Sequence, residues 1–359
     1  GETETQLVST THEYHDISLL PGDRVLLTRE SGTDAIEVEV AQGDAKRHAP
    51  MKPIAQVAAT LETEPSPRRG DAIDDPAIWV SPSAAEESLI LATDKRTGLY
   101  VYSMNGEIVQ HLAVGRLNNV DVRGNVAVAS LRDNNSLQFF DISQAGEVSM
   151  AQQVSTDLDE IYGLCMGYEE HTDRLSVYVN GKSGRIQQFW IKGVDDVKKV
   201  REMSVPSQPE GCVVDDKTQR LFVGEEDVGI WLFDAAVNSA EQGELIIKAT
   251  DVAEIVPDIE GLALAQYNSE TLLFVSSQGS DSYVIFDAEA PYTLRHHFRI
   301  RTNVELGIDG ASETDGLEVT TQSLGKGFEQ GALVVQDGRN RMPEAGQNLK
   351  LVPLQTVLD

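Results

Sequence analysis

Oxygen-bearing side chains recur along this sequence where short apolar segments begin. Six such segments cover residues 74–80, 118–124, 161–167, 210–216, 259–265 and 315–321. The polar residues at or just before their starts are Asp74, Asp75, Asn118, Asn119, Asp121, Glu160, Tyr162, Glu210, Asp258, Glu260 and Asp315. A single Asp or Asn before a strand is usually a turn residue. Six occurrences in register around one axis would instead form a ring of oxygen ligands.

A second set of polar residues lies in the turns after the next apolar segments. Its members are Lys95, Arg96, Arg132, Lys182, Glu225, Glu226, Gln278 and Asp337. The first three turns offer cations, whereas the last three offer acids and an amide. Each of these residues, taken alone, is an ordinary solvent-exposed turn residue. If both sets lie on one face of the fold, that face is half basic and half acidic.

The two sets together indicate metal-assisted chemistry on a phosphorylated substrate. Clustered carboxylates raise one another's pKa unless a cation compensates them, and Ca²⁺ accepts six to eight oxygen ligands. Bound cations let an acidic protein hold an anion, and adjacent Lys and Arg bind phosphate oxygens. Metals bridged by water can activate that water for attack on phosphorus. Because the sequence contains no P-loop, no cysteine-nucleophile motif and no R-H-G-x-R-x-P motif, this mechanism is favoured.

A repeated unit positions these residues. Pairs of β-rich segments joined by polar turns occur at 89–103, 126–141, 175–190, 221–234, 272–287 and 332–340, the last continued by 348–354. Apolar runs bounded by Gly, Asn or Asp are typical of hairpins. With the preceding segment, each unit has three or four strands in roughly 50 residues, as a propeller blade does. We therefore expect an all-β, six-bladed propeller over residues 56–359.

Residues 1–55 lie outside the repeat. HDISLL, RVLLT and AIEVEV predict strands, and QGDAKRHAPMKP resembles a linker. This part is expected to be a β-rich N-terminal extension, or the tail of a preceding domain. The segment IAQVAAT at 54–60 is a candidate for the strand that closes the last blade.

The composition of the chain argues against some classes of binding partner. The 359 residues include 58 acidic and 29 basic ones, giving a net charge of −29. Such a surface repels nucleic acid and anionic membranes. The sequence also lacks the run of about 20 apolar residues that a membrane-spanning helix needs. Taken alone, this charge fits an exported or salt-tolerant protein. We expect a monomer, secreted or periplasmic, whose signal peptide has been removed.

The cysteines and histidines show no transition-metal pattern. Cys165 and Cys212 lie far apart, and the seven histidines are scattered. Neither the spacing of a zinc site nor a disulfide framework results. One long-range disulfide and two buried free thiols both remain open.

Several motifs resemble the bacterial β-propeller phytases, from about residue 62 to 352. They are ETEP (62–65), GDAIDDPAIW (70–79), LNNVDVR (117–123), EIYG (160–163), NGKSG (180–184), PEGCVVDD (209–216), EEDVGIW (225–231), PDIEGLAL (257–264), SSQGSDSYVIFD (276–287), ETDGLEV (313–319) and VVQDGRN (334–340). Their number, order and spacing make the resemblance specific.

The resemblance implies calcium-dependent, stepwise hydrolysis of phytate, myo-inositol hexakisphosphate, as its calcium complex. Carried over motif by motif, the active-site calcium ligands are Glu62, Asp75, Glu210, Glu226, Asp258, Glu260, Gln278 and Asp315. The groups that hold phosphate are Lys95, Arg96, Arg132, Tyr162 and Lys182. Asp74 would act with metal-bound water, and a structural calcium is expected at Asp309, Asp337 and Asn340. The catalytic set is thus Asp74, Lys95, Arg132, Tyr162, Lys182 and Glu226.

Three features depart from the family pattern. Residues 1–50 have no counterpart in its compact members, although some relatives carry an incomplete domain in front. The turn at 132–136 has an unusual shape for the family, and Arg339 follows Gly338 at a position suited to a carboxylate.

Two other functions are compatible with the same propeller and calcium ligands. One is a calcium-dependent lactonase or phosphotriesterase on a similar propeller, which would need a single catalytic metal. The other is a non-catalytic binding propeller stabilised by calcium. Lys95, Arg132 and Lys182 on successive blades favour phosphomonoester chemistry over both.

Overall fold

The computed structural model describes residues 16–20, 24–28, 35–39, 54–192 and 196–358. The chain divides into two compact units, Gly1–Pro53 and Ile54–Asp359. In the first unit, β1 (Asp16–Leu20), β2 (Arg24–Thr28) and β3 (Ala35–Glu39) form an antiparallel sheet in that order. The three strands expected there are therefore confirmed, whereas the expected linker at 42–53 lies outside the described residues.

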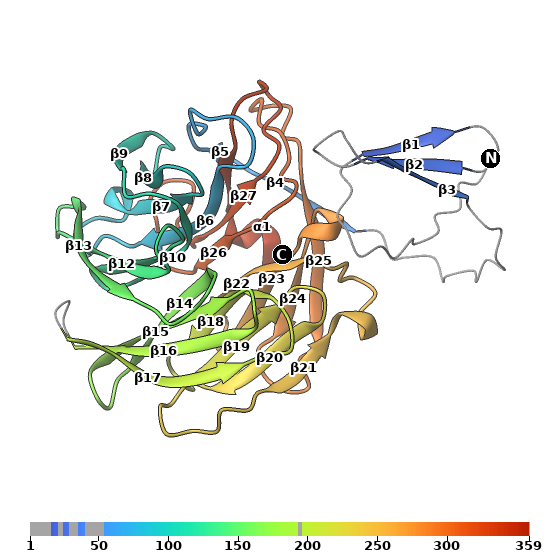
Figure 1. Cartoon of the computed structure of the whole chain (residues 1–359). Coiled ribbons are helices and arrows are strands. Elements are labelled where there is room, and N and C mark those ends of the chain that lie inside the picture. The colour runs from blue at the N-terminus through green and yellow to red at the C-terminus, as the bar shows by residue number, and fades with distance from the viewer. Residues whose placement is uncertain (1–15, 21–23, 29–34, 40–53, 193–195, 359) are drawn as a thin grey trace. The chain divides into compact units, whose positions relative to one another are not determined.

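Six small sheets make up the second unit, and they follow one another around a central axis (Figure 1). Blade one contains β6 (Ile73–Trp79), β7 (Leu89–Asp94), β8 (Gly98–Ser103) and β9 (Ile108–Leu112). Blade two contains β10 (Leu117–Arg123), β11 (Val126–Leu131), β12 (Ser136–Ile142) and β13 (Val148–Ser155). Blade three contains β14 (Ile161–Glu169), β15 (Arg174–Gly181), β16 (Arg185–Ile191) and β17 (Val197–Ser204).

The second half of the ring repeats this plan. Blade four contains β18 (Pro209–Asp215), β19 (Arg220–Glu225), β20 (Gly229–Asp234) and β21 (Glu244–Lys248). Blade five contains β22 (Ile259–Tyr267), β23 (Glu270–Ser277), β24 (Ser282–Asp287) and β25 (Leu294–Arg301). Blade six contains β26 (Leu317–Thr320), β27 (Ala332–Asp337) and β28 (Asn348–Pro353). The predicted six-bladed propeller is confirmed.

The ring is held together by apolar packing between neighbouring blades. Leu91 of blade one packs in a buried cluster with Ala129 and Phe140 of blade two, and each further cluster likewise joins adjacent blades. The innermost strands contact one another in succession, and β26 contacts β6, which closes the circle. Burial of these apolar side chains is the dominant favourable term in folding. It fixes the inner strands around one central channel.

A short strand from the start of the second unit completes blade six. β5 (Leu61–Glu62) pairs with β28, with Glu62 opposite Lys350. The preceding strand, β4 (Ala55–Ala58), instead pairs in parallel with β25 as a fifth strand of blade five. The expectation that 54–60 closes the last blade was therefore wrong. Its strand lies along Phe298–Arg301, and the chain reaches β28 only from Thr60 onward, where the Thr60 N–H donates to the Leu351 carbonyl oxygen.

The two cysteines of the chain are paired. Cys165 on β14 and Cys212 on β18 form a disulfide with their Cα atoms 5.6 Å apart. The bond links the inner strands of blades three and four, which are neighbours in the ring. The alternative of two free thiols does not hold.

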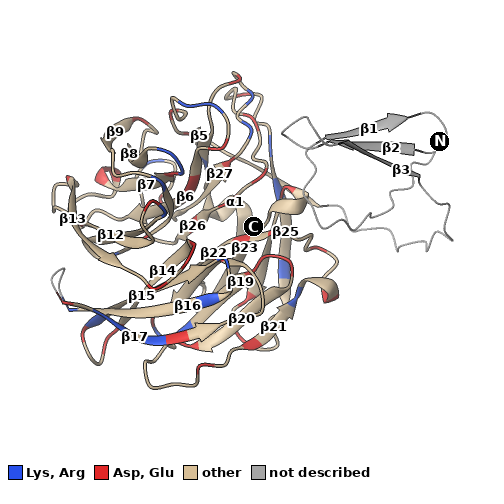
Figure 2. Ribbon diagram, viewed as in Figure 1, with Lys and Arg blue, Asp and Glu red and all other residues tan. Residues whose placement is uncertain are grey.

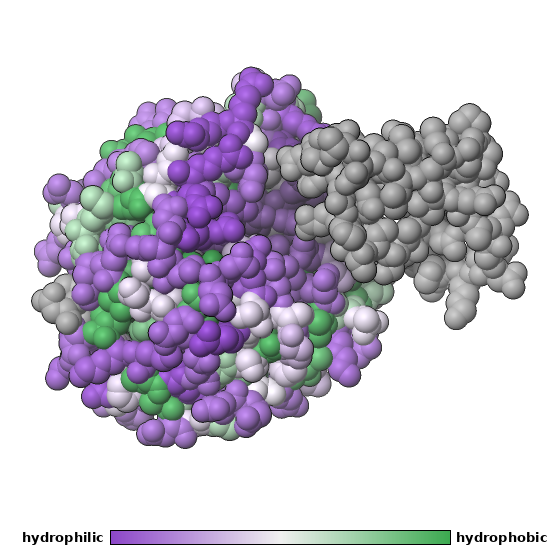
Figure 3. Space-filling view, viewed as in Figure 1, coloured by the Kyte–Doolittle hydropathy of each residue, from purple (hydrophilic) through white to green (hydrophobic). Residues whose placement is uncertain are grey.

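Only short helical segments occur among the described residues. α1 (Leu354–Leu358) follows β28, and η1 (Ala85–Glu87), η2 (Ala249–Asp251) and η3 (Gln278–Ser280) are single turns. None of these helices has the length and apolarity needed to cross a membrane. The face of the propeller seen in Figure 3 is largely hydrophilic, and acidic residues are spread widely over its ribbon (Figure 2).

Candidate active site

An irregularity in strand pairing recurs where the inner strands of blades one to five begin. In blade one, Ile73 pairs with Asp94 but Pro76 pairs with Ala92, so Asp74 and Asp75 fall in a bulge. Equivalent register shifts place the residue pairs 118–119, 162–163, 210–211 and 260–261 in bulges. A bulge leaves residues unpaired and re-aims their side chains. The fold therefore turns the predicted ring residues out of the β-ladder and toward the channel mouth.

Glycines in these bulges let neighbouring blades approach closely. A Cβ added to Gly163 would lie 1.9 Å from the Glu210 carbonyl oxygen, and one added to Gly211 would lie 2.1 Å from that of Glu260. In the sixth blade, a Cβ on Gly316 would lie 2.1 Å from Asp75 Oδ1. Such contacts are possible only without a side chain. The glycines thus draw the carboxylates of successive blades together.

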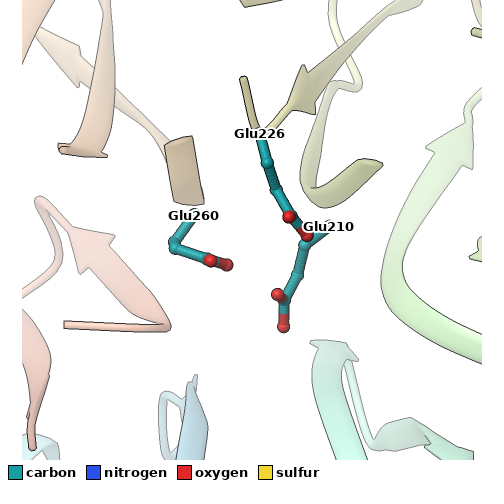
Figure 4. A group of neighbouring side chains, drawn as sticks. All are labelled: Glu210, Glu226 and Glu260. Carbon is teal, nitrogen blue, oxygen red and sulfur yellow. The ribbon is translucent and has the colours of Figure 1, made fainter. Parts of the chain in front are cut away.

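Three glutamates form the centre of the acidic side (Figure 4). One oxygen each of Glu210, Glu226 and Glu260 lies within 4.8 Å of the others. Glu210 and Glu260 are buried, and Glu260 Oε2 has no hydrogen-bond partner. Burial raises the pKa of Glu260 well above its usual range, and nearby Glu210 adds to the rise. Such a cluster is stable in its charged form only with a compensating cation.

Further oxygen donors adjoin the three glutamates. Burial raises the pKa of Glu226 to about 8. A hydrogen bond of 2.6 Å from Gln208 opposes this rise, whereas the Asp258 carboxylate adds to the rise. Asp258 also raises the pKa of Glu260. Gln278 Nε2 donates to Asp315 Oδ1 over 2.5 Å.

Lys95 connects this acidic side to blade one. Its Nζ lies 2.9 Å from Asp315 Oδ2, 3.1 Å from Asp71 Oδ1 and 3.4 Å from Asp74 Oδ1. Burial would lower the pKa of Lys95, but the Asp74 and Asp315 carboxylates outweigh it and raise that pKa well above its usual range. Lys95 therefore remains an ammonium ion at the channel mouth.

Asp74 is the most enclosed carboxylate of the site. It is fully buried, and neither carboxylate oxygen has a hydrogen-bond partner. Burial raises its pKa well above the usual range, although Lys95 opposes the shift. Burial likewise raises the pKa of Asp315 to about 6, again against Lys95.

Two further predicted cations, Arg132 and Lys182, gather around Tyr162. Lys182 Nζ lies 4.5 Å from the Tyr162 ring centroid, and the Arg132 guanidinium carbon lies 5.6 Å from it. These separations are in the range of cation–π contacts. Arg132 also donates to Asn118 Oδ1 over 3.1 Å, and Asn118 donates to Glu210 Oε1 over 2.8 Å. Hydrogen bonds thus run from the basic side of the mouth to the acidic centre.

Most predicted site residues are therefore brought together, while others, among them Asp75, Arg96 and Glu225, are placed differently. Asp75 accepts a hydrogen bond from the Val120 backbone N–H over 3.0 Å and lines a channel cavity of about 780 Å³ beneath the mouth. Burial raises the pKa of Asp75 well above its usual range, against that hydrogen bond. Arg96 is exposed beside Lys95. Glu225, from the predicted turn ring, is buried and accepts hydrogen bonds from Ser207 and Trp231.

Glu62 belongs to a second polar group. Fully buried Lys350 contacts Glu62 and lies 2.5 Å from Asp309 Oδ1 and 3.3 Å from Asp337 Oδ2. Asp337 Oδ2, Asn340 Oδ1 and Asn348 Oδ1 are buried without hydrogen-bond partners. These orphaned oxygens suit a hard cation. Lys350 already supplies one positive charge to the same group.

Sequence reasoning missed Lys350, Asp71 and Gln208. Lys350 had a readable signal, because it interrupts the apolar pattern NLKLV of a buried strand, and lysine is almost never fully buried without a partner. Asp71 and Gln208 lie in loops, and no local pattern indicates which side chain they meet.

Fold and site together define a six-bladed β-propeller with a carboxylate group suited to a metal, set beside lysine and arginine at the channel mouth. The phytase family model matches residues 31–359, and the chain belongs to that family. A 3-phytase of Bacillus subtilis (strain 168) is 34% identical to it, and the match covers 84% of each chain.

A solved structure supports the architecture independently. Regucalcin, a calcium-binding protein from Agrobacterium tumefaciens strain C58, superimposes with a TM-score of 0.54. The match covers 84% of this chain and 97% of that one at 11% identity. At that identity the likeness supports the propeller fold alone.

Proposed function

We propose that this protein is a calcium-dependent phytase that releases inorganic phosphate and lower inositol phosphates from myo-inositol hexakisphosphate. Membership of the phytase family and the similarity to a 3-phytase support the reaction. The observation that carries the metal dependence is the group Glu210, Glu226 and Glu260, which each place one carboxylate oxygen within 4.8 Å of the others.

The proposed calcium ligands fall into two groups. At the channel mouth they are Glu210, Glu226, Asp258, Glu260, Gln278 and Asp315, with Asp75 beneath. The second group is Asp309, Asp337 and Asn340, and Glu62 adjoins it through Lys350. When bound, calcium would supply Lewis-acid stabilisation of charge on the phosphate oxygens and would lower the pKa of a water ligand.

The chain's own cations would bind and orient the substrate. Lys95, Arg132 and Lys182 approach the mouth from blades one, two and three, with Tyr162 between the last two. Arg132 would bind phosphate oxygens in a bidentate manner and Lys95 as a point charge, while Arg96 would contact a neighbouring phosphate. Holding the phosphate against the attacking water removes much of the entropic barrier.

Asp74 is proposed to handle the proton. Its buried, unpartnered oxygens lie beside Lys95, and burial raises its pKa above the usual range, which makes this carboxylate a stronger base. It would orient the attacking water and take its proton as the new P–O bond forms. The P–O bond to the inositol breaks with its electron pair on the inositol oxygen, which takes a proton from solvent water, while Asp74 returns its own proton to solvent.

The location, domain and oligomer assignments are part of the same proposal. A disulfide is typical of an oxidising compartment and supports a secreted or periplasmic protein. Residues 56–359 would be the phytase domain and residues 1–55 an extension, which the division at Pro53 and Ile54 supports. The propeller would act as a monomer, without nucleic-acid or membrane partners.

A substrate panel tests the reaction class. Purified protein with excess Ca²⁺ would be assayed against inositol hexakisphosphate, an aryl phosphotriester and a γ-lactone. We expect turnover of the hexakisphosphate alone. Turnover confined to the lactone or triester would indicate the related propeller hydrolases. No turnover of any substrate, together with calcium-dependent thermal stabilisation, would indicate a binding propeller.

A further inference from the structure

In blades one to five, a single residue of the second strand faces the bulge of the inner strand. In blade one this residue is Thr93, which lies opposite Asp74 and Asp75. The equivalent residues of the next four blades are Ser130, Asn180, Gly224 and Ser276. The four that have side chains are polar, yet all of them are buried. Because buried polar groups are almost always hydrogen-bonded, these side chains are suited to satisfy backbone groups that a bulge removes from the ladder.

Three of these side chains also form a bridge to the next blade. Ser130 accepts a hydrogen bond from the Asn119 N–H over 3.1 Å and donates to the Tyr162 carbonyl oxygen of blade three over 2.6 Å. Ser276 donates over 2.8 Å to the Thr314 carbonyl oxygen, which precedes β26 of blade six. Such bonds tie the start of one inner strand to the start of the next. They act at the level from which the predicted site residues project.

Asn180 forms the third bridge, between blades three and four. Its Oδ1 accepts a hydrogen bond from the Gly163 N–H over 2.9 Å, and its Nδ2 donates to the Glu210 carbonyl oxygen over 2.8 Å. The residue is 1% exposed, and a Cβ added to Gly163 would lie 2.6 Å from Nδ2, so the amide packs directly against the bulge. One side chain thus joins the bulge that contains Tyr162 to the bulge that contains Glu210.

Blade four offers no equivalent side chain to Glu210. The residue of β19 that faces the Glu210 bulge is Gly224, and a Cβ added there would lie 3.1 Å from Ile259 Cγ2 of blade five. The Glu210 carboxylate is held separately, because Asn118 Nδ2 of blade two donates to its Oε1 over 2.8 Å. Blade two therefore orients the side chain of Glu210, whereas Asn180 of blade three holds its backbone.

We propose that Asn180 is a positioning residue, which sets the separation between the calcium ligand Glu210 and the phosphate-binding groups of blade three. The inference rests on the proposed phytase function and adds a residue that this function does not use. Asn180 acts through backbone atoms of Gly163 and Glu210, and it lies two residues before Lys182. Groups that orient metal ligands typically change metal affinity or activity by about 10- to 100-fold when they are replaced.

The test compares Asn180→Leu with Gln188→Met in the full chain, because both replace a buried amide by an apolar side chain of similar size. Gln188 also donates across the boundary between blades three and four, to the Ala235 carbonyl oxygen over 3.0 Å. Ala235 follows the end of β20 that is remote from the turn carrying Glu226. Each variant would be melted, titrated calorimetrically with Ca²⁺ from the calcium-free state, and assayed for kcat and KM on inositol hexakisphosphate.

We expect Asn180→Leu to weaken one class of calcium sites about tenfold and to lower kcat roughly 10- to 100-fold, with a smaller change in KM. Both variants should melt at lower temperature, since each leaves a buried carbonyl without its donor. Gln188→Met should nevertheless keep wild-type calcium binding and kcat. Asn180→Ser should recover part of both losses, because serine fills the equivalent position in blades two and five.

Calcium binding and kcat that are equal in Asn180→Leu and Gln188→Met would overturn the positioning role. If Asn180→Leu does not fold, Asn180→Ser takes its place: calcium binding weaker than in Gln188→Met would support the role, and equal binding would overturn it. A wild-type protein that binds calcium but releases no phosphate would refute the proposed phytase function. The calorimetric comparison would then still decide whether Asn180 positions the calcium ligand.

Discussion

Lys95 Nζ of blade one lies 2.9 Å from Asp315 Oδ2 of blade six, so one ion pair joins the first and last blades at the channel mouth. One partner is a proposed phosphate-binding group and the other a proposed calcium ligand. A metal cation bound to the Asp315 carboxylate would replace Lys95 as its partner, so that the Lys95 ammonium could bind phosphate. The pair thus couples the metal and substrate halves of the site.

Replacing Lys95 by Gln should lower kcat/KM for inositol hexakisphosphate about 100-fold or more, as loss of a preorganised charge at a reacting group does. The change removes an ammonium that lies 3.4 Å from Asp74 and 2.9 Å from Asp315. Lys198→Gln, on the outer strand of blade three, serves as the control and should leave the rate unchanged. Wild-type kinetics in Lys95→Gln would exclude a role in phosphate binding.

Replacing Glu226 by Gln should reduce turnover at limiting calcium by at least about 100-fold, because losing a ligand charge loosens the metal group. Excess calcium should restore part of the activity. The matched control is Glu147→Gln, at an exposed turn of blade two. Full activity of Glu226→Gln at every calcium concentration would remove Glu226 from the proposed ligands.

Calcium affinity should increase as pH rises. The pKa of Asp315 is raised to about 6 and that of Glu226 to about 8, chiefly by burial. A carboxyl group must lose its proton before it binds calcium, so protons compete with the metal below these values. The half-saturating calcium concentration for activity should fall from pH 6 to pH 8. A concentration that is constant or rises over this range would contradict the assignment.

The disulfide should stabilise the propeller. Cys165 and Cys212 are 47 residues apart in sequence, and removing a disulfide of this kind typically costs about 2–4 kcal/mol. The double variant Cys165→Ala, Cys212→Ala should therefore melt at a lower temperature, measured by circular dichroism with calcium present. Adding a reductant should lower the melting temperature of the wild type but not of the variant. Equal melting of wild type and variant would show that the bond contributes nothing.

The fold was predictable because each blade has a recognisable pattern within its own stretch of sequence. Six copies of an apolar strand, a polar turn and a second strand leave few architectures, and the bulge residues follow from the same alignment. Residues such as Asp74, Glu210 and Glu260 could therefore be placed at one mouth before any coordinates.

Contacts distant in sequence could not be predicted in this way. Glu62 carries no local sign that β5 pairs with β28 and brings it to Lys350, 288 residues away. Whether Cys165 meets Cys212 depends on the exact register of two inner strands.

The most direct measurement is phosphate release from inositol hexakisphosphate by the purified chain near neutral pH, titrated with Ca²⁺ and then with a chelator. The account predicts that release rises with calcium to saturation, is lost on chelation and returns when calcium is restored. Release that is unaffected by the chelator, or no release at any calcium concentration, would contradict it.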